Sequence, residues 1–87
     1  MGLKSLGGKN RIWILKMIAD IKRHLEAPVF VPFSIEMNDG RSIRVRSRDH
    51  IGVLIHAVAV EDDAGGVRVL AARNISGLTI PANGREG

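Results

Sequence analysis

The stretch from Phe33 to Val45, which reads FSIEMNDGRSIRV, decides the fold because it encodes a β-hairpin. Apolar and polar residues alternate on both sides of a central Asn-Asp-Gly, as in strands with one buried face. A two-residue turn would place the two apolar rows on opposite faces of the hairpin. A three-residue loop with Gly40 in the left-handed conformation pairs Ile35 with Ile43 and keeps both rows on one face. We therefore predict the three-residue loop.

A helix is predicted upstream, over residues 10–26. Asn10 is a favourable N-cap residue. Pro28 ends the helix, because the residue before a proline avoids the helical conformation. Apolar residues recur at spacings of three and four, which gives one stripe for packing on a sheet. The stripe consists of Ile14, Met17, Ile18, Ile21 and Leu25.

Three apolar residues of this helix lie off the stripe, namely Ile12, Trp13 and Leu15. A helix that is apolar almost all round in its first turns usually has a second packing partner. We therefore predict that these three residues form a subunit interface and that the protein is a homo-oligomer. The alternative is that the chain before Asn10 folds over them.

Three more strands are expected after the hairpin. The segment Arg48-Asp49-His50 interrupts the alternation, and a third strand follows at about residues 53–61. A polar, glycine-ended loop then leads to a fourth strand at residues 67–71. We predict an even-numbered loop between these strands. It pairs Val60 with Val67 and Val58 with Val69, and it directs all four side chains inward. A tight turn at residues 72–74 precedes a short closing strand that contains Leu78 and Ile80.

This order predicts an α+β fold in which an N-terminal helix precedes about five short antiparallel strands. We expect the strands to close as a small SH3-like or Sm-like barrel. An antiparallel meander with the helix packed on one face is the alternative. We expect residues 1–9 to be a flexible leader, residues 10–81 the single domain, and residues 82–87 a disordered tail.

The composition narrows the classes of function. The 87 residues contain no cysteine, which excludes disulfides and thiolate chemistry and favours a reducing cytoplasm. No apolar run reaches the ~20 residues that span a bilayer, so we expect no membrane partner. The three histidines lack the spacing of metal ligands, and we predict neither a metal nor a cofactor. Ser47, Asp49 and His50 are suitable types for catalysis, but neighbours in a strand point apart. We predict no catalytic residues and no enzyme.

Basic residues concentrate in the first half of the chain and point to an anionic partner. Residues 1–48 hold ten Lys and Arg against four Asp and Glu, whereas residues 49–87 hold three against five. Arg44, Arg46 and Arg48 alternate, which places them on one face about 7 Å apart, close to the spacing of successive phosphates. With Arg41 beside the turn, they form a candidate nucleic-acid ridge. The alternative is a solvated sheet face, with the domain serving only in homo-oligomerisation or protein interaction.

Two resemblances to known families bear on the fold, and one of them also bears on the candidate ridge. Residues 30–45, FVPFSIEMNDGRSIRV, resemble small bacterial proteins of unknown activity that carry F-x-P-F and D-G-R motifs after a short helix. Residues 35–41 are also similar to the first motif of Sm-like RNA-binding proteins, and Asn74-Ile75 followed by Leu78 to part of their second. This similarity implies a small barrel that binds RNA, and it adds Arg73 and Asn74 to the candidate nucleic-acid residues. Val45 stands near the place of the glycine at which the second Sm strand bends.

Overall fold

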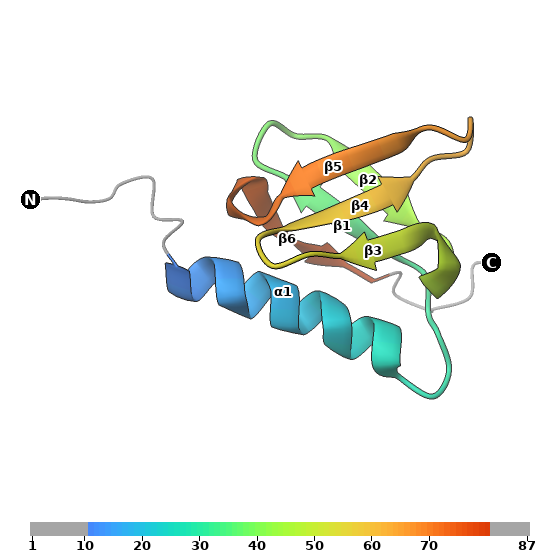
Figure 1. The fold of residues 1–87 in the computed structure, drawn as a ribbon, viewed down its shortest axis with the longest axis horizontal. Coiled ribbons are helices and arrows are strands. Elements are labelled where there is room, and N and C mark those ends of the chain that lie inside the picture. The colour runs from blue at the N-terminus through green and yellow to red at the C-terminus, as the bar shows by residue number, and fades with distance from the viewer. Residues whose placement is uncertain (1–10, 81–87) are drawn as a thin grey trace, which may run out of the picture.

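The computed structural model describes residues 11–80, which form one α-helix, six strands and two 3-10 turns (Figure 1). The elements are α1 (Arg11–Glu26), β1 (Phe33–Met37), β2 (Ser42–Val45), η1 (Arg48–His50), β3 (Ile51–Val53), β4 (Ala57–Glu61), β5 (Val67–Ala71), η2 (Ala72–Asn74) and β6 (Ile75–Thr79). The predicted leader, the N-cap Asn10 and the predicted tail lie outside the described residues. The predicted helix therefore agrees with α1 over its described length.

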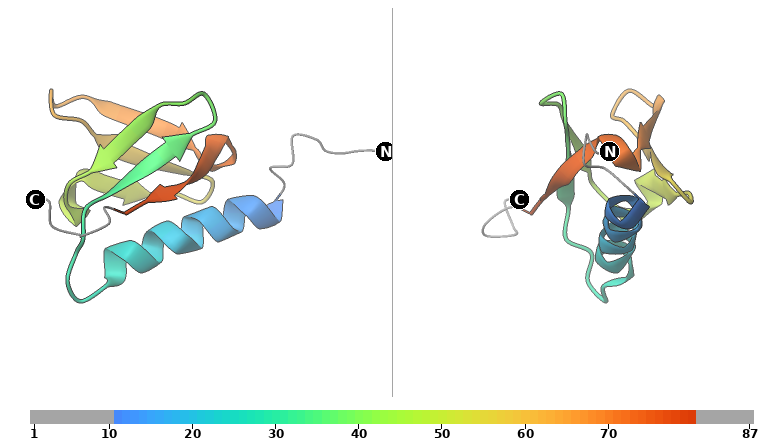
Figure 2. Two further views of the ribbon diagram at one scale, coloured as in Figure 1. Left: turned by 180° about the vertical axis from the view of Figure 1, so that it is seen from behind. Right: turned by 90° about the vertical axis from the view of Figure 1, so that its left-hand side faces the viewer.

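The strands form two antiparallel sheets of three, in the orders β2-β1-β6 and β3-β4-β5. The sheets face each other, and α1 runs along the open side between them (Figure 2). The helix contributes its predicted stripe to the core, with Met17, Ile18 and Ile21 buried. The α+β class with antiparallel strands is thus confirmed. Within residues 11–80 no ladder joins the two sheets, so the pairing of the strands does not confirm a closed barrel.

The first hairpin has the predicted register. Ile35 lies opposite Ile43 and Phe33 opposite Val45, and all four side chains are at most 8% exposed. Gly40 has a φ of 93°, the left-handed conformation that a three-residue loop requires. The turn chemistry and the apolar alternation therefore agree, which is why this part of the fold could be predicted.

The predicted register of the second hairpin is wrong by one residue. Val60 lies opposite Arg68, and Val58 opposite Leu70. Val67 and Val69 consequently face outward, with exposed fractions of 66% and 67%. The cause is an odd-numbered loop, whose geometry sets the pairing regardless of how apolar the displaced residues are.

The described part of the chain forms six strands where about five were predicted. The expected third strand is split, because Leu54 N donates to Ala57 O at 2.8 Å and closes a tight turn. Ile51 is thereby folded back against Val60. The apolar residues within this turn resemble strand residues, so alternation alone gave no sign of the break. The closing strand also begins earlier than predicted, at the fully buried Ile75.

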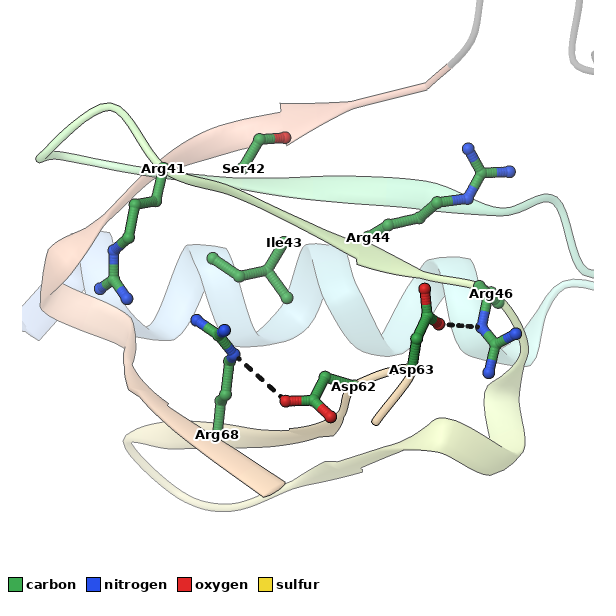
Figure 3. A pocket seen from close by; sticks show the side chains of 8 residues that line it. All are labelled: Arg41, Ser42, Ile43, Arg44, Arg46, Asp62, Asp63 and Arg68. Atoms are coloured by element: carbon green, nitrogen blue, oxygen red, sulfur yellow. Dashed lines mark ion pairs between the residues drawn. The ribbon is translucent and has the colours of Figure 1, made fainter. Parts of the chain in front are cut away.

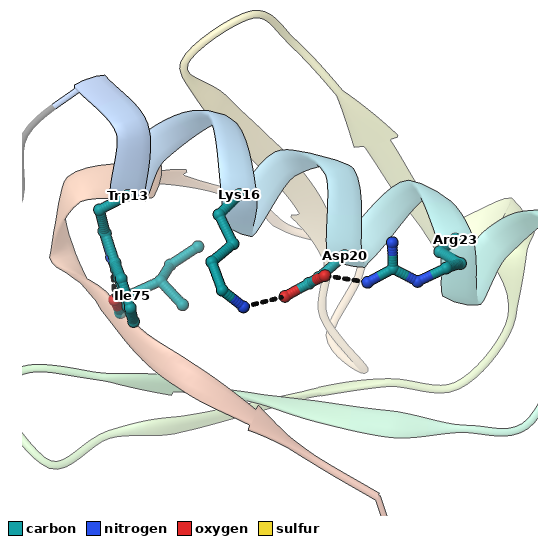
Figure 4. Close-up of polar contacts among 5 residues, drawn as sticks. All are labelled: Trp13, Lys16, Asp20, Arg23 and Ile75. Carbon is teal, nitrogen blue, oxygen red and sulfur yellow. Dashed lines mark hydrogen bonds and ion pairs between the residues drawn. The ribbon is translucent and has the colours of Figure 1, made fainter.

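Trp13 anchors the first turn of α1 to β6. Its indole Nε1 donates a hydrogen bond of 3.1 Å to the carbonyl of Ile75, and its ring is half-buried against the core (Figure 4). Ile12 and Leu15 remain 74% and 54% exposed. The three residues of the predicted interface therefore do not form one surface. Along the outer side of the helix, Lys16 lies 3.5 Å from Asp20, as their spacing suggested.

Candidate functional site

The predicted arginines converge in part at the free edge of β2. Within residues 11–80 this strand pairs only with β1, because it stands at the end of its sheet. Met37 N donates to Arg41 O at 2.8 Å, and hydrogen-bonded pairs alternate along an antiparallel ladder. The backbone groups of Ser42 and Arg44 therefore point away from β1, toward the edge.

A cleft of about 290 Å³ lies between this edge and the loop that joins β4 to β5 (Figure 3). We call it the arginine cleft. It is lined by Arg41, Ser42, Ile43, Arg44, Arg46, Asp62, Asp63 and Arg68. Four cations and two carboxylates leave the lining with a formal charge of +2, so the arginine cleft favours an anion.

Three ion pairs occupy arginines of the cleft. Arg46 Nε lies 3.1 Å from Asp63 Oδ1, which joins the end of β2 to the β4–β5 loop. Arg68 Nε lies 3.6 Å from Asp62 Oδ2. Exposed pairs of this kind stabilise a fold by only about 0–1 kcal/mol, so another anion can exchange with the carboxylate. Arg41 is held in a similar exposed pair by Asp39, at 2.8 Å.

Arg44 is the cation most available to a ligand. Its side chain extends away from Asp62 and Asp63 (Figure 3). It is exposed, and within residues 11–80 it has no ion-pair partner. Because Ile43 and Val45 on either side are buried, the backbone at this position is fixed while the guanidinium is free to adapt.

The two turn aspartates are held ionised by the backbone. The N–H of Gly66, and then that of Ala64, donate to the Asp62 carboxylate at 2.9 and 3.0 Å and lower its pKa. The N–H of Arg41 donates to Asp39 at 3.0 Å and lowers its pKa in the same way. Both carboxylates thus belong to the turns that they close, and their charge persists at neutral pH.

The other predicted nucleic-acid residues, Arg48, Arg73 and Asn74, lie outside the arginine cleft. Arg48 donates to the carbonyl of Ala27 at 3.2 Å, and its guanidinium lies 5.7 Å from the centre of the Phe30 ring. It therefore braces the connection between α1 and β1 and does not continue the row. Arg73 and Asn74 lie in η2, and neither belongs to the arginine cleft. The predicted ridge is thus reduced to Arg41, Arg44 and Arg46.

Arg68, Asp62 and Asp63 were not predicted as site residues. The incorrect register of the second hairpin placed Arg68 on the outer face, whereas the correct one directs it to the same side as Leu70. The signal that could have found it is the turn itself. Asp62 followed three residues later by Gly65 has the spacing of Met37 and Gly40 in the first hairpin.

Ser47 and His50 come together, contrary to the expectation that neighbouring side chains point apart. Ser47 Oγ lies 2.6 Å from His50 Nδ1, because residues 48–50 form the 3-10 turn η1 and not a strand. The same oxygen accepts from Asp49 N at 3.2 Å and so caps the turn. His50 Nε2 lies 3.4 Å from the Arg46 guanidinium, so the two ring nitrogens face a hydroxyl and a cation. A hydrolase triad instead orients its histidine with a carboxylate.

Comparison with protein-family models, curated proteins and solved structures gives no match to this chain. Among the described residues, no three His, Asp or Glu side chains gather to hold a metal ion. No helix within residues 11–80 has the length and apolarity needed to cross a bilayer.

Proposed function

We propose that this domain is a non-enzymatic binding module that holds the phosphate backbone of a nucleic acid along β2. The observation that supports it is the cationic edge strand, where the unpaired Arg44 is flanked by Arg41 and Arg46. Arg44 and Arg46 are two residues apart, which separates their positions by about 7 Å, close to the spacing of phosphates along a strand. Arg68 adds a fourth cation from the other side of the cleft.

The proposed contact involves backbone phosphates and not bases. Stacking on bases requires exposed aromatic rings. Phe33 is 1% exposed, and Trp13 and Phe30 are half-buried against the core, so none of the three aromatic residues offers a free platform. We therefore expect weak, sequence-independent binding that decreases steeply with salt concentration.

We also propose that the two sheets are the halves of a small barrel of the SH3-like type. The sheets are linked by η1 between β2 and β3 and by η2 between β5 and β6. If β2 and β3 are taken as one strand interrupted at η1, the order becomes that of a five-stranded barrel. The arginine cleft then lies where the wall opens. A cytoplasmic location, expected from the cysteine-free sequence, suits a ligand of this class.

The test is the binding of a labelled single-stranded oligonucleotide, followed by fluorescence anisotropy at about 50 and 200 mM salt. Wild type should bind with a clear salt dependence. The double variant Arg44→Glu and Arg46→Glu should lose at least about tenfold in affinity and about 1.4 in the slope of log K against log salt. Circular dichroism melting would establish that both proteins are folded.

The matched control is Lys22→Glu and Arg23→Glu, which changes the net charge equally on the exposed side of α1. Under the proposal this control retains most of the affinity. Equal losses in the two double variants would show that only net charge matters. Unchanged affinity in the β2 variant would exclude the arginine cleft as the site.

A further inference from the structure

The outer faces of the two sheets differ in chemistry. On the sheet β2-β1-β6, residues alternate between buried apolar and outward polar side chains, which is normal for a sheet with one solvated face. The outward residues of β1, β2 and β6 include Ser34, Glu36, Ser42, Arg44 and Thr79. This face therefore exposes no apolar surface that another protein would have to cover.

The sheet β3-β4-β5 has a second apolar face. Val58, Val60 and Leu70 point inward and are at most 4% exposed. The residues that alternate with them form what we call the outer face, and they are Ala57, Ala59, Glu61, Val67, Val69 and Ala71. Five of these six are apolar; Val67 and Val69 are 66% and 67% exposed, and the three alanines are half-buried. Strands that are apolar on both sides are typical of sheets covered on both faces.

The outer face carries opposite charges at its two ends. Glu61, opposite Val67, is exposed at one end. Beyond Ala71 at the other end, Arg11, His56 and Arg73 line a hollow of about 360 Å³. A partner that fits this face must therefore present a basic group at one end and an acidic group at the other.

We propose that this partner is a second copy of the same chain, packed face to face with its strands antiparallel to those of the first. A twofold axis in the plane of contact and perpendicular to the strands brings Glu61 of each copy toward Arg73 of the other. An axis parallel to the strands would bring the two Glu61 side chains together and the arginines together. The charges therefore select one arrangement, and each favourable contact occurs twice.

The extent of such a contact follows from the dimensions of the sheet. Two strands of five residues and one of three present about 200 Å² per copy, well below the roughly 800 Å² of a typical stable interface. The apolar surface extends at the basic end, where His56 borders both the hollow and a groove of about 830 Å³ beside Leu54 and Ile55. These two residues are 54% and 76% exposed. We expect a dimer that forms at protein concentrations of about 100 μM.

The first test is analytical ultracentrifugation from about 10 μM to 1 mM. The mass of the wild-type protein should rise toward twice that of the monomer. The double variant Val67→Gln and Val69→Gln should remain monomeric, whereas the control Thr79→Gln, on the polar sheet, should dimerise like wild type. A wild-type monomer throughout this range, or a double variant that still dimerises, would overturn the proposal.

The second test reverses the charges and does not depend on the valine variants remaining folded. Glu61→Arg alone and Arg73→Glu alone should each weaken the dimer, because like charges then meet across the axis. The combined variant should restore association, since every contact is again between opposite charges. Failure to restore it would overturn the antiparallel arrangement.

The dimer and the nucleic-acid proposal can fail separately. Val67→Gln and Val69→Gln leave the net charge unchanged, so oligonucleotide binding can persist when dimerisation is lost.

Discussion

Gly40 and Gly65 occupy the same position in two turns with the same hydrogen bonds, one in each sheet. Their φ angles are 93° and 89°. Gly40 N donates to Met37 O at 3.0 Å, and Gly65 N donates to Asp62 O at 3.0 Å. In both turns a second bond of 2.8 Å closes the loop, from Met37 N to the Arg41 carbonyl and from Asp62 N to the Gly66 carbonyl. The same turn thus sets the register of both hairpins.

Because the two glycines share one conformation, replacing either of them should lower the free energy of unfolding by the same amount. Gly40→Ala and Gly65→Ala should each destabilise the fold by about 1 kcal/mol, because a positive φ is unfavourable for a residue with a Cβ atom. Gly52→Ala is the control, since it lies in β3 at an ordinary φ with nothing within 4 Å of an added Cβ. Urea unfolding measures all three. A Gly52 variant as unstable as the other two would show that the turns are not the cause.

The aspartates of these turns predict a loss of stability in acid. The pKa values of Asp39 and Asp62 lie below the ordinary 3.8 in the folded protein, mainly because backbone N–H groups donate to the ionised carboxylates. A lowered pKa adds stability above the unfolded value, and this stability is lost as the pH falls through the folded value. We expect the melting temperature to be insensitive to these groups above about pH 4 and to decrease below it.

Carboxyl chemical shifts measured by NMR should give midpoints below 3.8 for both residues. Asp62→Asn should flatten part of the decrease in melting temperature, because an ionised carboxylate then no longer accepts from the N–H groups of Ala64 and Gly66. A midpoint for Asp62 at or above 3.8 would contradict the role given to the turn N–H groups.

The two hairpins show where sequence reasoning succeeded and where it could not. In the first, outward positions are polar, so alternation and turn type gave one answer. In the second, Val67 and Val69 are as apolar as the inward Leu70, and alternation could not say which set is buried. The turn did carry the answer, in the glycine three residues after Asp62. For the arginine cleft, Arg41, Arg44 and Arg46 were predicted from the first hairpin. Arg68 was not, because its position depends on the register of the second hairpin.

The anchoring of α1 by Trp13 predicts how substitutions in the first turn of the helix change the stability of the fold. Trp13→Ala should cost about 2 kcal/mol, since a half-buried ring and its hydrogen bond to Ile75 are lost. Trp13→Phe should cost about 1 kcal/mol, mainly through that bond. Ile12→Ala, at a side chain that is 74% exposed, should change stability by less than about 0.5 kcal/mol. Denaturant unfolding measures these values, and a Trp13→Ala protein of normal stability would contradict the anchoring of α1 to β6.

Asp63 offers the sharpest test of the arginine cleft, because its removal should improve binding. Its carboxylate is 85% exposed and pairs with Arg46, so it competes with any phosphate for that guanidinium. Asp63→Asn should therefore raise oligonucleotide affinity about two- to fivefold, as expected for an exposed ion pair worth about 0.5–1 kcal/mol. The control Glu26→Gln adds the same net charge at the end of α1, away from the cleft. Equal gains in both variants would assign the effect to net charge, whereas a gain confined to Asp63→Asn would show that the ligand contacts Arg46.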